Sequence, residues 1–503
     1  MDKKNKGFCS LVGAGPGDIG LLTLNAKEAV EQAQVVVYDY LCNPEILKWA
    51  PPDAELIYVG KKAGQHTLEQ EEINRLLVDK AGEGKRVVRL KGGDPFIFGR
   101  GGEEAEALVA SGLAFEVIPG VTSAIAVPAY AGIPLTHRNA TSAFTVFTGH
   151  EDPTKGTSTI NFKALVELNS TWVMLMGMQR LDAVVSELVQ NGADTHMPVA
   201  LIRWGTTGRQ ETVTGELGSI VAAADGFQPP AVAVFGSVVD LRPMLSWFEE
   251  RPLFGKRIVV TRTRKQAGAL SAKLRSLGAD VYELPTIRIE PPTNLREFAE
   301  LVRDAYQYDW LVFTSPNGVD AFFDMFYKLY DDARHIGNVK IAAIGPATAQ
   351  RIKEFHLSVD LKPDDFVAEG IISGLKEFGS VENLKFLLAR AEGARDILPR
   401  SLSQLGAIVD EAIAYRTVPE TNDVTGAMER FRSEGADLVT FTSSSTVENF
   451  LVLKLPWPSG ARTASIGPVT SETMRKHGLR VDIEASRYDM EGLVEAILKL
   501  FGA

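Results

Sequence analysis

Cysteine is almost absent from this sequence, which holds two among its 503 residues, Cys9 and Cys42. Two cysteines are too few for a disulfide framework or a closed structural zinc site. No apolar run reaches the roughly 18 residues that a membrane span needs. The charged N-terminal segment leads into a short strand and not into the apolar core of a signal peptide. We therefore expect a cytoplasmic protein without a membrane span.

Positive charge is also in deficit. Lys and Arg total 53 against 64 Asp and Glu, a formal net charge of −11. Nucleic-acid binding requires basic stripes that neutralise phosphates, so we expect no nucleic-acid partner. The seven histidines show no spacing with Cys or carboxylates that matches a metal-ligand set, and we expect no metal. Any anionic substrate must be met by local clusters of positive residues.

Short apolar segments alternate with helical patterns along the whole chain. Such runs, followed by glycine-rich turns, are typical of strands buried on both faces of mostly parallel sheets. The chain is therefore predicted to have an α/β fold. The strands expected from this pattern are Cys9–Val12, Gln34–Tyr38, Arg86–Lys91, Phe144–Thr148, Trp172–Met176 and Arg257–Thr261.

A domain boundary is predicted between Glu249 and Gly255, where a terminal helix gives way to Pro and Gly. The first domain, 1–250, is expected to have lobes of about 1–120 and 121–250. Beyond the boundary, Phe313–Val319 recurs as Phe441–Val447, and Ala343–Thr348 recurs as Ser465–Thr470. This repeat predicts two similar α/β lobes in 255–503, with doubly wound parallel sheets. The first lobe, about 255–288 plus 420–503, is discontinuous, and the second spans about 289–419.

The first loop, Val12–Asp18, contains three glycines between a strand and a helix. Such a loop lets a backbone approach a ligand closely, although it often serves only a tight turn. It departs from the dinucleotide fingerprint, because Pro16 removes a backbone donor and no third glycine stands at Leu21–Leu22. A nicotinamide-dependent oxidoreductase is therefore a remote alternative.

Two further segments are more specific. Arg89–Glu104 places five glycines around an apolar triplet, Phe96–Phe98, that we expect to be buried. The other segment runs from Val117 to Ala124 and continues through Gly132–Arg138. Together with Val37–Leu41 and Val59–Lys62, these segments resemble the tetrapyrrole methylase family and, within it, the uroporphyrinogen-III C-methyltransferases. The resemblance covers about Phe8 to Leu245.

This resemblance implies a two-lobed methylase domain that transfers methyl groups from S-adenosylmethionine to two ring carbons of uroporphyrinogen III. The products are precorrin-2 and S-adenosylhomocysteine, on the route to sirohaem and cobalamin. Because the sulfonium is a cation, an apolar cradle with backbone carbonyls and one carboxylate suits it. The family's cofactor contacts correspond here to Pro16, Gly92, Gly93, Asp94, Ile97, Thr122, Ser123, Met176 and Gly205. Asp94 is also typical of a turn or helix-cap residue.

The pyrrole carbon is the nucleophile, so alignment of the reactants supplies much of the rate and a carboxylate base is useful for the departing proton. By family position Asp39 is the candidate base. Lys61 is the candidate acid or carboxylate partner, although a lysine on a polar loop is more often a solvated charge. Eight substrate carboxylates make Arg100, Arg138 and His66 reasonable clamps.

The second half opens with Gly255–Arg262 and, with its duplicated Thr-Ser and Ile-Gly-Pro segments, resembles the uroporphyrinogen-III synthases over about Gly255 to Leu500. The resemblance implies closure of hydroxymethylbilane to uroporphyrinogen III with inversion of ring D. Tyr415 matches the family tyrosine proposed to assist hydroxide departure; packing as a strand-end aromatic is the alternative. Strand-end hydroxyls and the following helix N-termini suit propionates and acetates. The residues concerned are Thr314, Ser315, Thr442 and Ser443.

The two resemblances predict a bifunctional enzyme, because a synthase that makes uroporphyrinogen III is joined to a methyltransferase that consumes it. An active methyltransferase with a catalytically silent, tetrapyrrole-binding second half is the alternative. Family analogy further predicts a homodimer that forms through the methylase domain.

Overall fold

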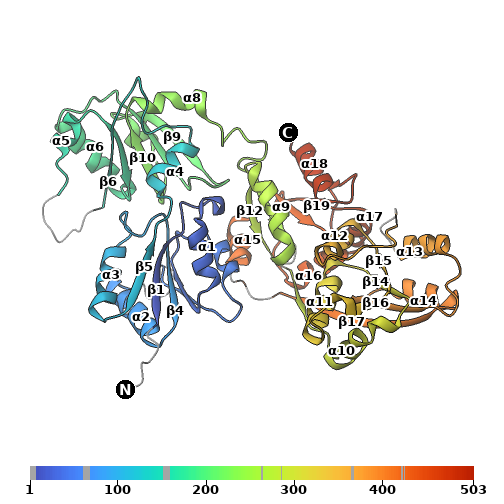
Figure 1. The fold of residues 1–503 in the computed structure, drawn as a ribbon. Coiled ribbons are helices and arrows are strands. Elements are labelled where there is room, and N and C mark those ends of the chain that lie inside the picture. Colours follow the sequence, from blue (N-terminus) through green and yellow to red (C-terminus); the bar gives the residue numbers. More distant parts are fainter. Residues whose placement is uncertain are drawn as a thin grey trace, which may run out of the picture. The chain divides into compact units, whose positions relative to one another are not determined.

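The computed structural model describes residues 7–60, 68–150, 159–261, 264–284, 286–363, 368–420, 423 and 425–502. These residues form four five-stranded sheets (Figure 1). The chain divides into two compact units. The first comprises 1–284, 422–447 and 455–503, and the second comprises 285–421 and 448–454. The first three sheets belong to the first unit and the fourth sheet to the second.

The first sheet is entirely parallel, with strand order β3-β2-β4-β1-β5. Alternate strand residues enter two separate hydrophobic clusters, one with α2 and α3 and one with α1 and η2, so helices cover both faces. Thr23 caps α1, and Glu69 and Glu72 form a capping box at α2. The elements are β1(Phe8–Gly13), η1(Ile19–Leu21), α1(Leu24–Glu31), β2(Val35–Tyr38), η2(Pro44–Trp49), β3(Glu55–Tyr58), α2(Gln70–Gly82), β4(Arg86–Lys91), α3(Gly101–Ala110) and β5(Ala114–Ile118).

The second sheet has the order β6-β7-β10-β8-β9. Only β6 and β7 pair in parallel, and the other three pairs are antiparallel. The prediction of mostly parallel strands is therefore wrong here. Antiparallel neighbours such as β8 and β9 need only a short turn, whereas parallel ones need a crossover. The elements are α4(Ser123–Tyr130), β6(Phe144–Thr148), α5(Phe162–Glu167), β7(Thr171–Leu175), η4(Met178–Arg180), α6(Leu181–Gln190), β8(Pro198–Arg203), β9(Glu211–Glu216), α7(Ile220–Ala223), β10(Ala231–Phe235), η5(Ser237–Leu241) and α8(Arg242–Leu245).

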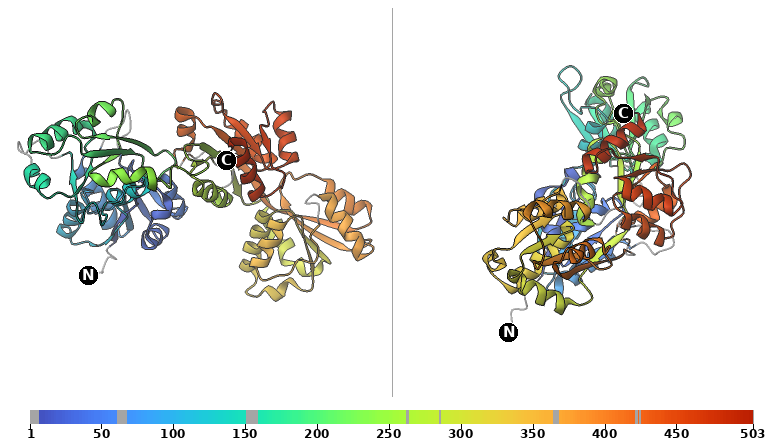
Figure 2. Two further views of the ribbon diagram at one scale, coloured as in Figure 1. Left: turned by 90° about the horizontal axis from the view of Figure 1, so that it is seen from above. Right: turned by 90° about the vertical axis from the view of Figure 1, so that its right-hand side faces the viewer.

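The third sheet joins two distant parts of the sequence. Its order is β12-β11-β18-β19-β20, all parallel, with β11 beside β18. Figure 2 shows the corresponding yellow-green and red ribbons side by side. The predicted discontinuous lobe is thereby confirmed. The elements are β11(Arg257–Val260), α9(Arg264–Ser276), β12(Asp280–Glu283), α15(Ala427–Glu434), β18(Leu438–Phe441), α16(Ser444–Val452), β19(Arg462–Ser465), α17(Pro468–Lys476), β20(Ile483–Glu484) and α18(Met490–Phe501).

The fourth sheet has the order β13-β17-β16-β14-β15 and is parallel except for the edge strand β13. Separate clusters cover its faces, one with α10–α12 and one with α13 and α14. The elements are β13(Ile287–Glu290), α10(Leu295–Arg303), η6(Ala305–Gln307), β14(Trp310–Phe313), α11(Pro316–Leu329), η7(Ala333–Ile336), β15(Lys340–Ala343), α12(Pro346–Glu354), α13(Ala368–Leu375), η8(Lys376–Phe378), β16(Lys385–Ala391), α14(Ile397–Gln404) and β17(Ile408–Pro419).

The sequence repeat corresponds to a repeated strand–turn–helix. β14 ends at Phe313 before α11, and β18 ends at Phe441 before α16. The second repeated motif leads in the same way from β15 to α12 and from β19 to α17. Each of the third and fourth sheets thus carries one copy. Among the described residues, no helix is both long and apolar enough to span a membrane.

Candidate active sites

Three glycines meet where β1, β4 and β5 end. A Cβ atom on Gly13 or Gly120 would lie closer than 3.0 Å to backbone atoms of the other two glycine segments, and Gly93 has φ +69°. The amide N–H of Gly93 donates to Gly15 O at 2.7 Å, and Gly15 N donates back at 3.2 Å. The loops after β1, β4 and β5 therefore touch through bare backbone, an arrangement that only glycine allows.

Asp94 ties two of these loops together. Its Oδ1 accepts from Phe96 N at 2.8 Å and its Oδ2 accepts from Gly120 N at 3.0 Å. Both carboxylate oxygens thus cap backbone amides, the turn role that the sequence left open beside a cofactor contact.

Loops of the second sheet complete the same region. Asp18 N donates to Thr206 Oγ1 at 3.1 Å, and Tyr130 on α4 donates to Asp18 Oδ2 at 2.7 Å. A Cβ on Gly205 would lie closer than 3.0 Å to the Val127 side chain on α4. The Pro16 loop, the Gly205 loop and α4 are therefore packed together. Thr122 Oγ1 accepts from Ala124 N at 3.3 Å and caps α4, which begins at Ser123.

Left-handed backbone is concentrated in these loops. Among the residues that the structure describes, nine non-glycine residues have positive φ, and five of them lie in the candidate cofactor and substrate segments: Phe98, Arg100, Met176, Trp204 and Thr206. Such conformations cost of order 1–3 kcal/mol each and cluster at functional sites. Met176, at the end of β7, is also 52% exposed, which leaves its thioether available to a ligand.

The apolar triplet in the loop after β4 is not buried as predicted. Phe96, Ile97 and Phe98 are 55%, 44% and 42% exposed. The Asp94 cap and the positive φ of Phe98 (54°) turn the chain along the surface before α3 begins. The glycine-rich loop thus presents an apolar surface beside the backbone cradle.

Asp39 lies on the turn after β2, in the same region. Its side chain is 26% exposed; Oδ2 pairs with Arg89 Nη2 at 3.1 Å and Oδ1 accepts from Leu41 N at 3.1 Å. Tyr40 meets the Trp204 ring edge-on with centroids 5.8 Å apart. A Cβ on Gly92 would collide with Leu41 Cβ. The candidate base therefore lies among the candidate cofactor loops.

Sequence reasoning missed the buried charged side chains next to Asp39, of which Arg89 binds it directly. Arg89 and Lys91 are 3% and 4% exposed, and both bind Glu104, which is fully buried. The available signal was the spacing: cations at alternate positions of an apolar strand point to one face, where they need a buried partner.

The predicted carboxylate clamps differ in what the structure shows. Arg100 forms a two-pronged pair with Glu103, at 2.8 and 2.7 Å, and this hydrogen bonding raises the pKa of Arg100. Arg138 is exposed. Lys61 and His66 lie outside the described residues.

In the second unit, Tyr415 and Ser315 are brought together. The Tyr415 hydroxyl lies 2.9 Å from Ser315 Oγ, which also accepts from Gly318 N and caps α11. Tyr415 is 7% exposed, and burial raises the pKa of its phenol despite the hydrogen bonds of Ser315 and Asn317. Thr314 Oγ1 lies 3.5 Å from Ala389 O. The neutral phenol thus lies at the carboxyl end of β14, with Tyr415 paired to Ala391, the last residue of β16.

The matching hydroxyls of the first unit lie at the end of β18. Ser443 Oγ accepts from Thr446 N at 3.3 Å at the start of α16, and Thr442 is half-buried beside it. The repeat therefore places Thr442 and Ser443 at the same strand end as Thr314 and Ser315, each pair before a helix N-terminus.

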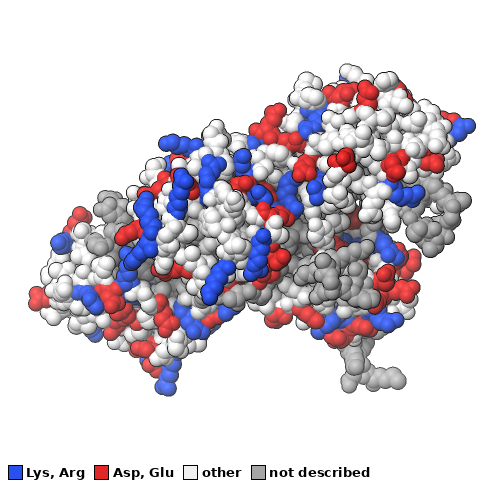
Figure 3. All heavy atoms as spheres, turned by 180° about the vertical axis from the view of Figure 1, so that it is seen from behind, with Lys and Arg blue, Asp and Glu red and all other residues white. Residues whose placement is uncertain are grey.

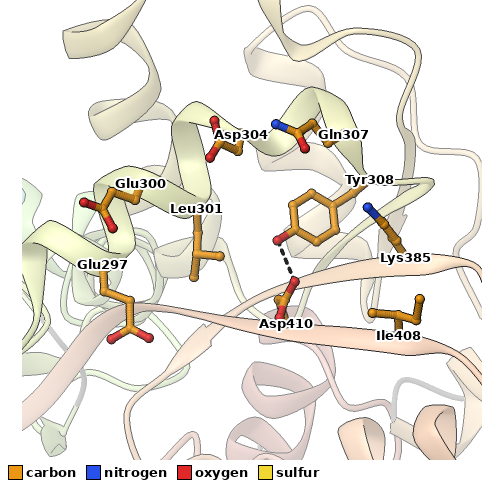
Figure 4. Close-up of a pocket in the computed structure, with 9 residues that line it drawn as sticks. All are labelled: Glu297, Glu300, Leu301, Asp304, Gln307, Tyr308, Lys385, Ile408 and Asp410. Carbon is orange, nitrogen blue, oxygen red and sulfur yellow. Dashed lines mark hydrogen bonds between the residues drawn. The ribbon is translucent and has the colours of Figure 1, made fainter.

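One pocket of the second unit lies at the opposite strand ends (Figure 4). It measures about 440 Å³ and combines four carboxylates with one lysine near the Tyr308–Asp410 hydrogen bond of 2.7 Å. It is lined by Glu297, Glu300, Leu301, Asp304, Gln307, Tyr308, Lys385, Ile408 and Asp410. Its charge would repel a polycarboxylate, so this pocket is not a tetrapyrrole site.

On the face drawn in Figure 3, acidic and basic side chains are interspersed.

The first cradle fits S-adenosylmethionine. At Gly13 and Gly120 a Cβ would collide with the backbone of the neighbouring loops, so the three loops can meet only as bare backbone, and exposed Ile97 and Met176 offer apolar contact. Apolar surroundings of this kind suit the sulfonium of the cofactor. Among the described residues there is no group of three or more His, Cys, Asp or Glu able to hold a metal ion.

The cradle can be tested by adding one methyl group. Gly120→Ala is expected to lower stability by about 1–3 kcal/mol, because its Cβ meets backbone that cannot move aside. Affinity for S-adenosylhomocysteine, measured by calorimetry, should fall about 10–100-fold, because the displaced loops no longer meet in the geometry of the cradle; the loss corresponds to about 1.4–2.8 kcal/mol of binding free energy. Gly102→Ala is the matched control, since its Cβ meets nothing within 4 Å. Equal affinities of the two variants would contradict the cradle.

Two family models match the chain in succession. The tetrapyrrole (corrin/porphyrin) methylases match residues 9–221, and uroporphyrinogen-III synthase HemD matches 268–495. Porphyrin biosynthesis protein HemD of Ruminiclostridium josui is 39% identical over 99% of this chain and 98% of its own length. The S-adenosyl-L-methionine-dependent uroporphyrinogen III methyltransferase of Methanosarcina barkeri is 52% identical over 48% of this chain and 95% of its own.

A solved structure is similar to the first half. The uroporphyrin-III C-methyl transferase of Thermus thermophilus complexed with S-adenyl homocysteine shares 37% sequence identity, with a TM-score of 0.40. The match covers 46% of this chain and 93% of that chain.

Proposed function

Because this chain belongs to the tetrapyrrole methylase family over its N-terminal half and to the uroporphyrinogen-III synthase family over its C-terminal half, we propose that one polypeptide catalyses two consecutive reactions. Hydroxymethylbilane is cyclised to uroporphyrinogen III with inversion of ring D. Two methyl groups then pass from S-adenosylmethionine to uroporphyrinogen III, and precorrin-2 and S-adenosylhomocysteine form. The product serves the sirohaem and cobalamin branches.

The observation that carries the proposal is the convergence of loops around the glycine cradle. Backbone contacts join the loops after β1, β4 and β5, and Asp18 and Gly205 add the second sheet and α4. The cofactor supplies an electrophilic methyl group. Pro16, Gly92, Gly93, Asp94, Ile97, Thr122, Ser123, Met176 and Gly205 are proposed to bind it, and the predicted lobes of 1–250 supply its two sides.

Asp39 is proposed to accept the proton that the macrocycle loses after methylation. Its carboxylate is partly exposed and lies beside Tyr40 and Leu41, which pack against the cofactor loops. Lys61 is proposed as an acid or carboxylate partner. A base fixed in this way contributes about 10²–10⁴-fold to the rate.

The substrate carboxylates are proposed to bind Arg100, Arg138 and His66. Arg100 can exchange its partner cheaply, because its pair with Glu103 is about half exposed on both sides. Exposed ion pairs contribute about 0–1 kcal/mol, so a multiply charged substrate can displace Glu103.

In the synthase half, the phenol of Tyr415 is proposed to donate a hydrogen bond to the departing hydroxyl of the bilane. Carbon–oxygen cleavage then leaves an azafulvenium cation, and the substituted α-carbon of ring D attacks it to form a spiro intermediate. Burial keeps the phenol protonated, and Ser315 orients it. Thr314, Ser315, Thr442 and Ser443 are proposed to bind propionates and acetates at helix N-termini.

The setting of the enzyme is also a proposal. We expect a cytoplasmic homodimer that pairs through the methylase domain and binds no nucleic acid. The supporting observations are family analogy, the net charge of −11, and the two free, buried cysteines Cys9 and Cys42. Free buried thiols suit a reducing compartment.

One experiment tests both reactions. The protein is supplied with hydroxymethylbilane anaerobically, with and without S-adenosylmethionine, and the products are separated by isomer-resolved chromatography and weighed by mass spectrometry. We expect isomer III without the cofactor and a gain of two methyl groups with it. Isomer I at the spontaneous rate, with added isomer III still methylated, would make the second half a silent binding module. No conversion of either substrate would refute the proposal.

A further inference from the structure

A network of four charged side chains joins the Asp39 turn to the inside of the first sheet. Arg89 Nη2 donates to Asp39 Oδ2 at 3.1 Å, and Arg89 Nε donates to Glu104 Oε1 at 3.1 Å. Lys91 Nζ donates to the same Glu104 oxygen at 2.6 Å. β4 thus contributes both cations, while the carboxylates come from α3 and from the turn after β2.

Only one member of the network reaches the surface. The side chains of Arg89 and Lys91 are 4% and 5% exposed and that of Glu104 is fully buried, whereas that of Asp39 is 26% exposed. Burying charged groups costs desolvation free energy, and apolar residues of similar volume often stabilise a fold equally well. The network is therefore weak evidence for a role in stability. Its one exposed end is the carboxylate assigned above as the base.

We propose that Arg89 is a positioning residue for methyl transfer: it holds the Asp39 carboxylate in one orientation toward the tetrapyrrole. This inference rests on the proposed role of Asp39. With Oδ2 on the guanidinium and Oδ1 on Leu41 N, both carboxylate oxygens are fixed. A base held this way reaches the proton in one geometry, and a displacement of about 1 Å can cost about 10²-fold in rate.

Arginine suits this position because its planar fork binds two partners at once. Nε faces Glu104, Nη2 faces Asp39, and Nη1 donates to Leu90 O at 3.0 Å, so the group cannot rotate freely. Burial opposes its charge, but Asp39 and Glu104 together outweigh that effect and raise the pKa of Arg89. The guanidinium is therefore charged throughout the working pH range.

Lys91 provides a matched control within the same strand. It shares the Glu104 partner of Arg89 and feels the charge of Asp39, but its ammonium is bound to Glu104 and does not hold the Asp39 carboxylate. Burial, and then the neighbouring Arg89 charge, lower the pKa of Lys91. Replacing either cation by glutamine removes one buried charge beside Glu104. Only the replacement of Arg89 also releases Asp39.

The test measures methyl transfer to uroporphyrinogen III by the full chain. Arg89→Gln is expected to lower kcat about 10–100-fold, with KM for S-adenosylmethionine changed less than about twofold. Lys91→Gln should stay within about threefold of the unchanged protein. In an Asp39→Asn background, Arg89→Gln should cause no further loss, because the side chain it positions is already inactive. If Arg89→Gln does not fold, Arg89→Lys, which keeps the charge but lacks the fork, must lower kcat at least about fivefold.

Other outcomes separate the two proposals. If Asp39→Asn slows methyl transfer but Arg89→Gln is no slower than Lys91→Gln, the positioning role of Arg89 is refuted. The proposed function is unaffected by that result. If Arg89→Gln lowers kcat by the same factor in the unchanged protein and in the Asp39→Asn background, the effect of Arg89 is structural. That result would also overturn the positioning role. A fully active Asp39→Asn would remove Asp39 as the base and overturn this inference with it. No methyl transfer by the unchanged chain would refute the proposed function.

Discussion

Asp39→Asn is expected to lower kcat for methyl transfer by about 10²–10⁴-fold, because an amide cannot accept the proton that the macrocycle must lose. Its carbonyl oxygen can still accept from Leu41 N, so the turn after β2 should keep its shape. The measurement is the steady-state rate of methylated product formed from uroporphyrinogen III. Affinity for S-adenosylhomocysteine should be nearly unchanged, since the cradle consists mainly of backbone.

Two controls accompany Asp39→Asn: the synthase activity of the same protein, and a variant of an exposed aspartate on α2. Synthase turnover of the Asp39→Asn protein should equal that of the unchanged chain. Asp79→Asn makes the same charge change at an exposed position of α2 and should leave both activities intact. Methyl transfer by Asp39→Asn within about threefold of that by Asp79→Asn would remove Asp39 as the base.

Tyr415→Phe should slow the enzymatic formation of uroporphyrinogen III by about 10²–10⁴-fold, the contribution of a well-placed acid. Phenylalanine keeps the ring in the core of the second unit but loses the hydroxyl that meets Ser315. Because burial raises the pKa of the phenol above its ordinary value of 10, the unchanged enzyme should show no loss from tyrosine ionisation between about pH 7 and 9. The ratio of isomer III to isomer I reports how much of the product the enzyme forms and how much arises by spontaneous closure.

Tyr308→Phe is the matched control in the same unit. Its hydroxyl donates to Asp410 at the opposite strand ends, within the acidic pocket of Figure 4. Its loss should leave synthase turnover unchanged. If Tyr415→Phe were as active as Tyr308→Phe, Tyr415 would be a packing residue, while the synthase assignment would stand on the bifunctional assay.

Much of the fold could be predicted, because local patterns dictate it. β4 and β6 begin and end at the predicted residues, because short segments rich in β-branched and aromatic residues between turn signals favour strands. The discontinuous lobe followed from the repeated motif. Pairing direction did not follow, because the residues of β8, β9 and β10 fit a parallel or an antiparallel neighbour equally well.

The sequence predicted which segments form the candidate site, but it did not predict which side chains in them contact one another. Motif resemblance indicated the loops, and the structure brings Gly93, Gly120, Asp39 and Gly205 into one region. The exposure of Phe96–Phe98 was missed, because their surroundings depend on a left-handed turn at Phe98. The roles of these residues stay predictions until the variants are measured.

The sequence by itself determined the class of the fold, the segments that resemble each family and the pairing of two families in one chain. These depend on residue type and spacing along the backbone. Tertiary structure alone decided that Arg89, itself bound to Glu104, holds Asp39, that Ser315 meets Tyr415, and that Asp94 caps two loops. The physical reason is that hydrogen bonds and ion pairs require distances near 3 Å. Residues separated by 15, 50 or 100 positions come that close only when the sheets have formed.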